Sequence, residues 1–192
     1  MRKIPTLFVR DPHDMARVLP EVHPDCAWVI AGEGVATAKL DGVCTMLDDA
    51  GRWWARREIK PGKAEPANFV EADSDPITGK RTGWEPIEQS PFAKLHRRAL
   101  DATPDDDPVA DSYELLGPKI NGNPHGYGEH VLVRHGSIVL TDVPTEFEDL
   151  RAQFAEWVRT SSRPYEGVVW HHPDGGRRAK LKVRDFRREI TA

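Results

Sequence analysis

The sequence predicts an α+β protein dominated by antiparallel hairpins. Short segments with alternating apolar residues are separated by clusters of Gly, Pro, Asn and Asp, which is typical of strands joined by turns. Residues 147–157 instead repeat apolar residues at helical spacing. A chain of 192 residues is long enough for one domain with a substantial core, whereas two full domains would be tight. We therefore expect a single domain over residues 1–192.

The first third of the chain predicts strands around one helix-like segment. Residues 7–9 indicate a short strand and residues 12–19 a helix-like piece. Residues 35–47 are rich in β-branched residues around one glycine, which predicts two strands or one bent strand. A turn at 48–51 leads into a returning strand at 53–56.

The middle of the chain, residues 61–111, is expected to be a loop-rich insertion. It is rich in Pro, Gly, Asp and Asn up to residue 90, with one short strand at 84–87. Ser90 and Pro91 indicate the start of a helix whose apolar face carries Phe92, Leu95 and Ala99.

The last third predicts further strands and one longer helix. Residues 112–117 form a strand, 121–124 a turn, and 131–140 a hairpin around residues 135–137. Thr145 and Glu148 have capping-box spacing before a helix with Phe147, Leu150, Phe154 and Trp157 on one stripe. Residues 165–170 and 179–183 alternate as two strands around a turn at 173–176.

Composition indicates a soluble protein. The chain is 39% hydrophobic and 30% charged, and no apolar run approaches the roughly 20 residues of a membrane span. Residues 1–6 lack the apolar core of a secretory signal. Cys26 and Cys44 make neither a disulfide framework nor a four-ligand metal site. We therefore expect a cytoplasmic protein that does not bind membranes.

The charge is unevenly distributed. A net charge of −4 argues against a protein that coats nucleic acid in general. One stretch is acidic (Asp101, Asp105, Asp106, Asp107 and Asp111), and a C-terminal stripe is basic (Arg177, Arg178, Lys180, Lys182, Arg184, Arg187 and Arg188). This stripe fits either a polyanion contact or a solvated face, and charge alone does not separate the two.

Lys39 carries the most specific chemical signal. It stands in the segment Lys39-Leu40-Asp41-Gly42, which resembles the pattern of the covalent nucleotidyltransferases, in which a lysine amine attacks the α-phosphate of a nucleotide. A Lys-x-Asp-Gly alone is weak, since a chain this long contains one by chance roughly 5% of the time. The chemistry further requires carboxylates for a divalent ion and cations that stabilise the phosphate charge of the transition state.

Those further groups follow in the sequence. Glu166 precedes Gly167 on a predicted strand, where a ligand can approach closely. Lys180 and Lys182 are alternate residues of a strand and so share one face. Glu114 and Arg56 lie on two further predicted strands.

Together these residues resemble motifs I, Ia, III, IV and V of the ATP-dependent ligase and mRNA-capping superfamily. A narrower resemblance, over about residues 34–183, is to the small 5′–3′ RNA ligases of the vertebrate RNA ligase 1 type. It is carried by residues 54–61, by Gly83-Trp84-x-Pro86 and by residues 114–124, of which Ile120-Asn121-Gly122-Asn123-Pro124 is the most specific part.

The resemblance implies a nucleotidyltransferase (ATP-grasp-like ligase) domain of two antiparallel β-sheets flanked by helices, with ATP in the cleft between the sheets. No recognisable OB-fold follows residue 183. It also implies that Lys39 takes AMP from ATP and passes it to an RNA 5′-phosphate, after which an RNA 3′-hydroxyl displaces AMP.

The resemblance assigns a role to each residue. Asp41 positions the lysine and the nucleotide, and Lys180 and Lys182 grip the α-phosphate. Glu166 binds the divalent ion, Mg²⁺ or Mn²⁺, and Glu114 is a second candidate ligand. The predicted nucleotide-binding residues are Thr37, Ala38, Lys39, Leu40, Gly42, Arg56, Glu114, Glu166, Lys180 and Lys182.

Three alternatives stay open. Ala38 stands where many relatives have glutamate, so the choice of ATP over another nucleotide is unsettled. Another lysyl-nucleotidyl transfer, by a DNA ligase or an RNA-capping guanylyltransferase, is one rival function. A nucleotide- or RNA-binding module without the chemistry is the other. The oligomeric state is not predicted.

Overall fold

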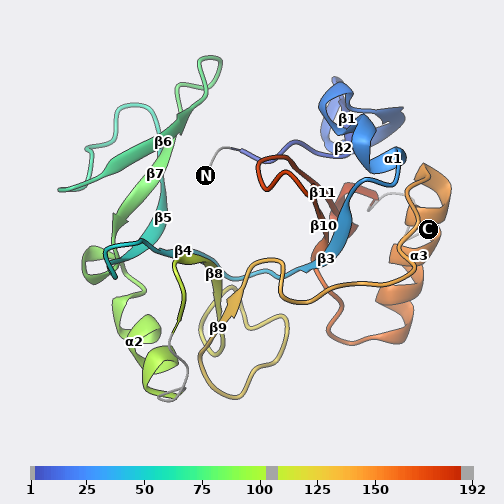
Figure 1. Ribbon diagram of the computed structural model, residues 1–192. Helices are drawn as coiled ribbons and strands as arrows, with labels where there is room; N and C mark the ends of the chain where they lie inside the picture. The colour runs from blue at the N-terminus through green and yellow to red at the C-terminus, as the bar shows by residue number, and fades with distance from the viewer. Residues whose placement is uncertain (1–2, 103–107, 187–192) are drawn as a thin grey trace. The chain divides into compact units, whose positions relative to one another are not determined.

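The computed structural model describes residues 3–102 and 108–186, which form two compact units (Figure 1). Unit 1 comprises Met1–Lys3 and Asp41–His135, and unit 2 comprises Ile4–Leu40 and Gly136–Ala192. The chain passes from unit 2 to unit 1 after Leu40 and returns after His135. The Lys-x-Asp-Gly motif is therefore divided, with its lysine in unit 2 and its Asp-Gly in unit 1.

The expected arrangement of two sheets flanked by helices is wrong. The described part of the chain is mostly β and holds three antiparallel sheets of two, three and six strands. Helices are few there: α1 (Ala27–Ile30), α2 (Ala93–Ala102), α3 (Phe147–Thr160) and three short 3₁₀ turns. The expectation came from the resemblance, which does not fix how many strands pair with one another.

Unit 1 contains the six-stranded sheet, in the order β6-β7-β5-β4-β8-β9. The central hairpin pairs β4 with β5, as the alternation around residues 48–51 predicted. Helix α2 packs beside β9, and a small core forms around Ala99, Leu115 and Ile120. The strands are β4 (Val43–Leu47), β5 (Trp53–Ile59), β6 (Val70–Ser74), β7 (Arg81–Pro86), β8 (Asp111–Leu116) and β9 (Val131–Arg134).

The region expected to be loop-rich, residues 61–111, holds regular structure at several points. It contains β6, β7, the 3₁₀ turn η2 (Ile87–Gln89) and α2. The predicted strand at 84–87 is the end of β7, and the predicted helix is α2, which begins at Ala93. That the region is an insertion stays a prediction.

Unit 2 contains the other two sheets. Strands β11, β10 and β3 form one sheet in that order, and β1 and β2 form a two-stranded ribbon. Its elements are β1 (Phe8–Asp11), β2 (Asp14–Val22), η1 (Pro24–Cys26), α1, β3 (Val35–Lys39), α3, β10 (Gly167–His171), β11 (Arg178–Lys182) and η3 (Val183–Phe186).

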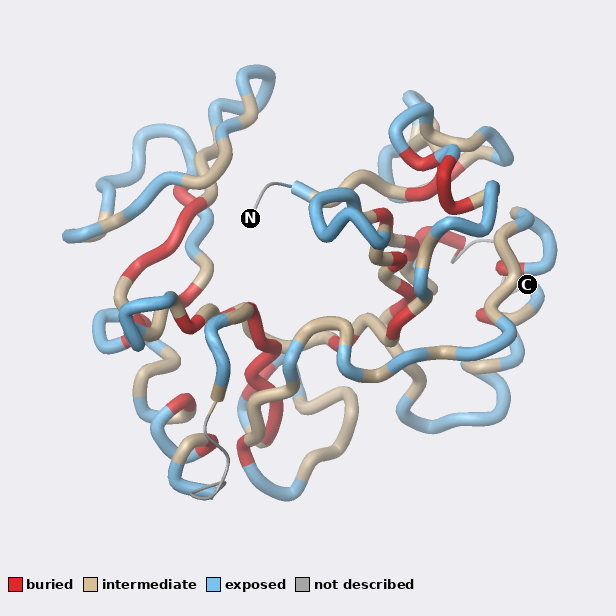
Figure 2. The backbone as a smooth tube through the Cα atoms, in the orientation of Figure 1, coloured by how far each residue is buried: buried red, intermediate tan, exposed pale blue. Residues whose placement is uncertain are grey.

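The larger core lies entirely within unit 2 (Figure 2). Leu150 and Phe154 of α3, predicted from the apolar stripe, are fully buried. They pack in a cluster that contains Val168 and Trp170 of β10 and Leu181 of β11. One face of the three-stranded sheet is thus committed to the core, which leaves the other face for polar groups.

Three local predictions are wrong. Residues 14–22 are a strand rather than a helix-like piece, because they pair with β1. Residues 131–134 pair with β8 and residues 138–140 run beside β3, so they do not form a hairpin with each other. The N-cap of α3 is Glu146, without a side-chain cap, rather than Thr145.

No helix in the described ranges is long and apolar enough to span a membrane.

Candidate active site

Three lysines lie on one face of the three-stranded sheet of unit 2. Gly167 of β10 is paired with Lys39 on one side and with Lys182 on the other. Val169, two residues further along β10, is paired with Lys180. Because residues two apart on a strand share a face, Lys39, Lys180 and Lys182 face the same side. The pairing thus brings together three amines that are up to 143 positions apart in the chain.

Glu166 binds two of these amines at once. Its Oε2 is 2.5 Å from Nζ of Lys39, and its Oε1 is 2.5 Å from Nζ of Lys182. Its backbone is also fixed, because its N–H donates to the carbonyl of Lys39 and its carbonyl accepts from Val183. Burial by itself would raise the pKa of this carboxyl, but the charges and hydrogen bonds of the two lysines lower the pKa below its usual value.

The face has an excess of positive charge. One carboxylate, Glu166, stands against three ammonium groups, and the guanidinium of Arg184 lies 4.0 Å from it. Burial, together with the charges of Lys182 and Lys39, lowers the pKa of Lys180 to about 8. Such mutual repulsion between like charges is relieved when an anion binds. The face is therefore suited to a phosphate-bearing ligand, and we call it the lysine face.

Gly167 makes this arrangement possible. A Cβ at this position would lie 2.0 Å from the carbonyl oxygen of Leu181 and 2.7 Å from Cα of Lys182. Both contacts are with backbone, so neither yields without moving β11. Only glycine fits, and its missing side chain leaves the centre of the lysine face open.

The other residues predicted around Lys39 are buried or paired in the sheet. Thr37 is 2% exposed and its hydroxyl donates to the carbonyl of Val169 at 3.0 Å. The backbone N–H of Ala38 donates to the carbonyl of Ile138, and Leu40 is 7% exposed. In this structure these three side chains support the strand that carries Lys39.

In unit 1, Glu114 holds the Asp41–Gly42 segment. Its Oε1 accepts from the backbone N–H of Gly42 at 2.8 Å, and its Oε2 is 2.7 Å from Nε2 of His135. The carboxylate is 11% exposed. Both oxygens are thus engaged within the protein, which gives Glu114 an anchoring role. Metal binding by Glu114 stays a prediction and would require one of these bonds to break.

Divalent cations have one candidate ligand on the lysine face, Glu166. The described residues contain no group of three or more His, Cys, Asp or Glu side chains that could hold a metal ion by themselves. Magnesium is commonly bound by one or two carboxylates together with substrate phosphates and water. Both oxygens of Glu166 are bonded to lysines, so metal binding by Glu166 also stays a prediction and would require one of these bonds to break.

Arg56 and Gly42 both line a pocket of about 650 Å³ in unit 1. Its walls also include Phe92. The bases Lys3, Arg56 and Lys80 are matched there by the acids Glu58, Asp73 and Asp75, so its charges balance. The guanidinium of Arg56 lies 5.8 Å from the ring centre of Trp84. A pocket of this size accommodates a nucleotide-sized ligand. The structure thus brings Arg56 close to the Asp-Gly half of the lysine motif.

Two residues that the motifs did not assign bind that same segment. Asn121 donates from Nδ2 to Oδ1 of Asp41 at 2.9 Å, and Nε2 of His125 accepts from the backbone N–H of Asp41 at 2.9 Å. The sequence signal was the turn at 121–124, which indicates a loop but not its partner. His135 was likewise not singled out, and Arg184 was named only as a member of the basic stripe.

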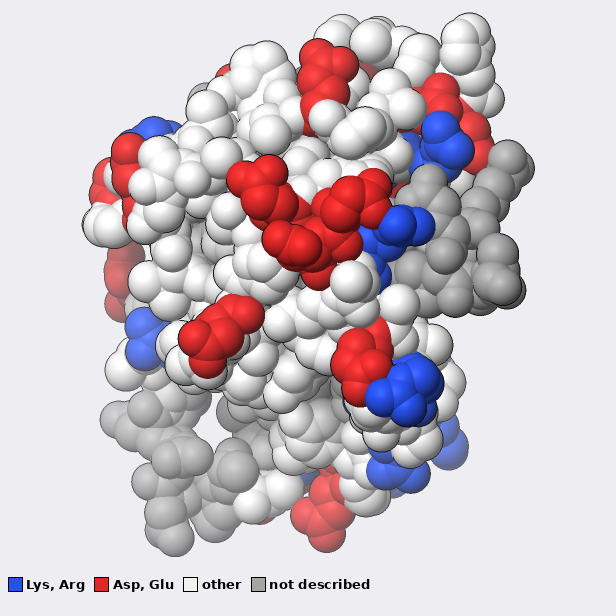
Figure 3. All heavy atoms as spheres, turned by 90° about the vertical axis from the view of Figure 1, so that its right-hand side faces the viewer, with Lys and Arg blue, Asp and Glu red and all other residues white. Residues whose placement is uncertain are grey.

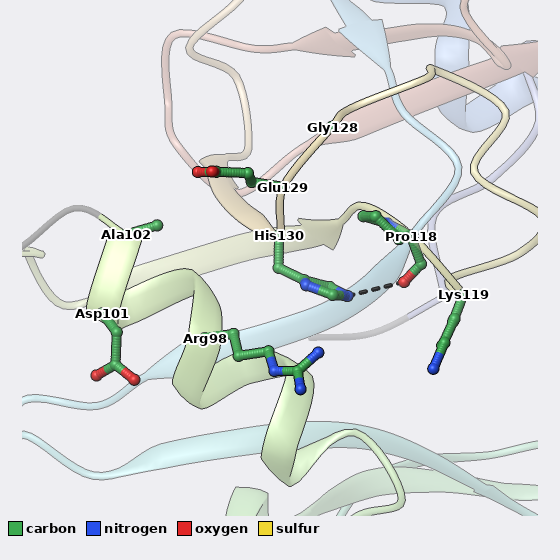
Figure 4. A pocket seen from close by; sticks show the side chains of 8 residues that line it. All are labelled: Arg98, Asp101, Ala102, Pro118, Lys119, Gly128, Glu129 and His130. Atoms are coloured by element: carbon green, nitrogen blue, oxygen red, sulfur yellow. Dashed lines mark hydrogen bonds between the residues drawn. The ribbon is translucent and has the colours of Figure 1, made fainter.

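A second pocket of unit 1, of about 460 Å³, contains none of the predicted site residues (Figure 4). Arg98 and Lys119 line it, but so do Asp101 and Glu129. Its charges therefore balance, and it offers no preference for an anion.

The charged stretches are only partly described. In the basic stripe, Lys180 and Lys182 lie on the lysine face, whereas Arg177 binds Asp174 at 2.7 Å. In the acidic stretch, Asp111 binds Arg134 at 2.7 Å. Asp105, Asp106, Asp107, Arg187 and Arg188 lie outside the described residues.

The described residues form no continuous basic surface on the side of the molecule drawn in Figure 3. Asp and Glu side chains gather near the centre of that view, and Lys and Arg occur there in small separate groups.

Comparisons with known proteins agree on one family. The family model for RNA ligase 1 matches residues 93–186. RNA ligase 1 of Danio rerio is 38% identical over 78 residues, which is 35% of this chain and 23% of that protein. RNA ligase 1 of Pongo abelii and of Mus musculus are each 34% identical over 82 residues, which is 40% of this chain and 24% of each protein.

The match covers about a quarter of the length of these relatives. The residues matched by the family model include Glu114, Asn121, Glu166 and both lysines of β11, and they begin after Lys39. The resemblance seen in the motifs is thereby confirmed independently of the lysine motif. Over residues 93–186, just under half of its length, the chain is similar to the RNA ligase 1 family.

Proposed function

We propose that this protein is an ATP-dependent RNA ligase that joins a 5′-phosphate to a 3′-hydroxyl through an AMP linked to Lys39. The observation that carries the proposal is the lysine face. There, Glu166 binds Lys39 and Lys182, and Lys180 lies on the same face of the sheet, in a chain that is similar to RNA ligase 1. A protein that only bound RNA would need positive charge, but not a lysine held at a fixed point beside a carboxylate.

The reaction has three balanced steps. First, Nζ of Lys39 bonds to the α-phosphorus of ATP, the bond to the bridging oxygen breaks, pyrophosphate leaves, and the amine loses a proton. Second, an RNA 5′-phosphate oxygen attacks the same phosphorus, and the lysine leaves and regains a proton. Third, an RNA 3′-hydroxyl attacks the 5′-phosphate, loses its proton and displaces AMP.

Each residue of the lysine face has a part in this chemistry. Lys180 and Lys182 bind the phosphate oxygens, on which negative charge builds up as the new bond forms. Glu166 holds Lys39 in the free protein and accepts a magnesium or manganese ion when the triphosphate binds. Such an ion, when bound, neutralises phosphate charge and helps pyrophosphate to leave.

The residues of unit 1 complete the proposal. Asp41 and Gly42 follow the nucleophile directly in the chain, and Arg56 provides a guanidinium for a ribose or phosphate group. RNA with a 5′-phosphate and a 3′-hydroxyl is the proposed partner. The cytoplasm is the proposed compartment, since neither Cys26 nor Cys44 forms a disulfide within the described residues.

The test is intact-mass spectrometry after incubation with ATP and Mg²⁺ or Mn²⁺. We expect the native chain to gain one AMP, and peptide mapping to place it on Lys39. Lys39→Arg is the matched variant, because its guanidinium keeps a positive charge beside Glu166 but is not a nucleophile. It should fold normally and gain nothing.

The acceptor is tested separately. The adenylylated protein should join a 5′-phosphorylated RNA to a 3′-hydroxyl end and leave a 5′-hydroxyl RNA unjoined. An adduct with GTP instead of ATP, or joining of DNA instead of RNA, would favour the rival transferases. Absence of any nucleotide adduct on a folded native chain would reject the proposed chemistry and leave the binding-module function.

A further inference from the structure

The loop between β8 and β9 is bonded to the Asp41–Gly42 segment. Nδ2 of Asn121 donates both to Oδ1 of Asp41, at 2.9 Å, and to the carbonyl oxygen of Gly42, at 3.0 Å. Nε2 of His125 accepts from the N–H of Asp41, and Glu114 accepts from the N–H of Gly42. Both amides, one carbonyl and one carboxylate oxygen of this dipeptide are therefore bonded. All of these residues belong to unit 1.

The loop between β8 and β9 is held in shape by contacts that do not involve Asp41. At its ends, Nε2 of the buried His130 donates to the carbonyl of Pro118 at 2.7 Å (Figure 4). At its centre, the amide of Asn123 bonds the N–H and the carbonyl of Tyr127. Ile120 is 1% exposed and packs in the core of unit 1. The loop thus has a shape of its own.

That shape depends on unusual backbone conformations. Asn121 has a φ of 47° and Asn123 a φ of 55°, in the left-handed region that side chains other than glycine and asparagine seldom adopt. Each such residue costs on the order of 1 kcal/mol. Asn121 is exposed, so its hydrogen bonds contribute only about 1 kcal/mol to folding in return. Stability alone gives little reason for the arrangement.

We propose that Asn121 and His125 are positioning residues that act through Asp41. Asn121 fixes the rotamer of the Asp41 carboxylate together with the peptide that follows it. His125 fixes the amide of Asp41, two residues after Lys39 in the chain. This inference rests on the proposed function, because it assigns the two side chains a part in forming the lysyl-AMP.

The effect on rate comes from orientation. A misplacement of about 1 Å in an active site can cost on the order of 100-fold in rate. Without Asn121, the Asp41 carboxylate can turn to other rotamers, and the Asp41–Gly42 segment loses two of its hydrogen bonds. The chemical step should therefore slow while ATP still binds.

The central variant is Asn121→Gly, because glycine accepts the left-handed conformation and removes only the amide. We expect the single-turnover rate of lysyl-AMP formation to fall by about tenfold or more, with the dissociation constant for ATP within about twofold of native. Asn68→Gly is the matched control. Asn68 has a φ of 56°, is exposed, and is not among the residues bonded to Asp41–Gly42, so its variant should keep the native rate.

Two further variants separate positioning from a merely structural role. His125→Gln offers an oxygen acceptor in place of Nε2 and should retain more of the rate than His125→Ala. In an Asp41→Ala background, Asn121→Gly should lower the rate by much less than it does in the native chain, because the carboxylate is gone and only the bond to the Gly42 carbonyl remains to be lost.

The outcomes are distinct. The inference would be overturned, while the proposed function stands, if Asn121→Gly formed lysyl-AMP at the native rate. It would also be overturned if Asn121→Gly lowered the rate as much in the Asp41→Ala background as in the native chain. Weaker ATP binding at an unchanged limiting rate would also overturn it, since Asn121 would then contact the nucleotide directly. If the native chain itself takes up no AMP, the proposed function fails, and this inference fails with it.

Discussion

At the scale of single residues, Lys180 differs from its neighbours on the lysine face. Lys39 and Lys182 each bind Glu166 directly, whereas Lys180 faces the positive charge of both. Burial and these charges together bring its pKa to about 8. Most of its charge is therefore present at pH 7, and the charge is lost as the pH rises through about 8.

The affinity for ATP should fall as Lys180 loses its positive charge. Because a neutral Lys180 no longer attracts phosphate, we expect the dissociation constant for ATP to rise between pH 7.5 and pH 9, by at most about tenfold per pH unit above 8. Lys180→Arg stays charged throughout and should flatten the profile. Calorimetric titration of the native chain and of Lys180→Arg with ATP across this pH range measures the two profiles. An equally steep rise in Lys180→Arg would assign the pH dependence to another group.

His96 is a second group with a lowered pKa, and its titration should affect the stability of the protein. Its ring is 3% exposed, packs edge-on against Trp53, and has an Nε2 without a hydrogen-bond partner among the described residues. Burial, with a smaller contribution from Arg97, lowers its pKa to about 4 against an opposing effect of Glu88. The unfolded chain therefore binds a proton between pH 6.5 and pH 4 that the folded protein does not.

The free energy of unfolding should fall as the pH drops through that range, by up to about 3 kcal/mol from His96 alone. His96→Phe keeps an aromatic ring against Trp53 and removes the titration. Urea unfolding of both proteins at pH 7.5 and pH 4 gives the difference. If the native chain does not lose more stability than His96→Phe, the buried ring is not the cause.

The motifs located the residues of the lysine face but not the partners of Asp41. Lys39, Glu166, Lys180 and Lys182 each stand in a short pattern that is readable by itself, and the sheet brings them together. Asn121 and His125 reach Asp41 from about 80 positions along the chain. Nothing in the sequence around residues 121–125 indicates that distant partner.

At the scale of elements, the pairing of β10 with β11 depends on one glycine. Gly167→Ala would push a Cβ against the backbone of β11, and such overpacking typically costs 1–3 kcal/mol. We expect a lower melting temperature and, because Lys182 is the paired residue, slower formation of lysyl-AMP. Gly128→Ala is the control, since a Cβ there meets nothing within 4 Å. Equal melting temperatures for the two variants would contradict this account.

Elements with local partners were the ones that the sequence predicted well. The hairpins β4–β5 and β10–β11 close through short turns, and their strands were found. Residues 138–140 were misassigned because their partner, β3, lies about 100 positions earlier in the chain. The number of sheets depends on such distant pairings, which alternation along a segment does not encode.

At the scale of the whole molecule, the main segment of unit 1 is inserted in the chain between two neighbouring segments of unit 2, which a hairpin turn could otherwise join. Residues 36 and 38 exchange backbone hydrogen bonds with residues 140 and 138, as antiparallel neighbours do. The chain leaves this pair after Leu40 and returns to it at Gly136. The larger core contains no residue of unit 1.

Unit 2 should therefore fold without unit 1. A chain in which an Asn-Gly turn joins Leu40 to Gly136 should unfold cooperatively on heating, and Phe154→Ala in its core should cost about 3–5 kcal/mol. It should not form lysyl-AMP, since Asp41, Gly42 and Glu114 are absent. A gradual thermal transition would show that the core of unit 2 needs unit 1. An AMP adduct would show that those three residues are dispensable.

The position of β3 also determines when the lysine face can form during synthesis. Lys39 is made early, but the strand beside it begins at Gly167 and the lysines of β11 come later still. At roughly 5–20 residues per second, the ribosome needs on the order of 10 s to supply them. All the residues of unit 1 are translated in that interval. A nascent chain therefore carries its nucleophile without Glu166, Lys180 or Lys182 until more than a hundred further residues have been added, and the proposed reaction with ATP must wait for them.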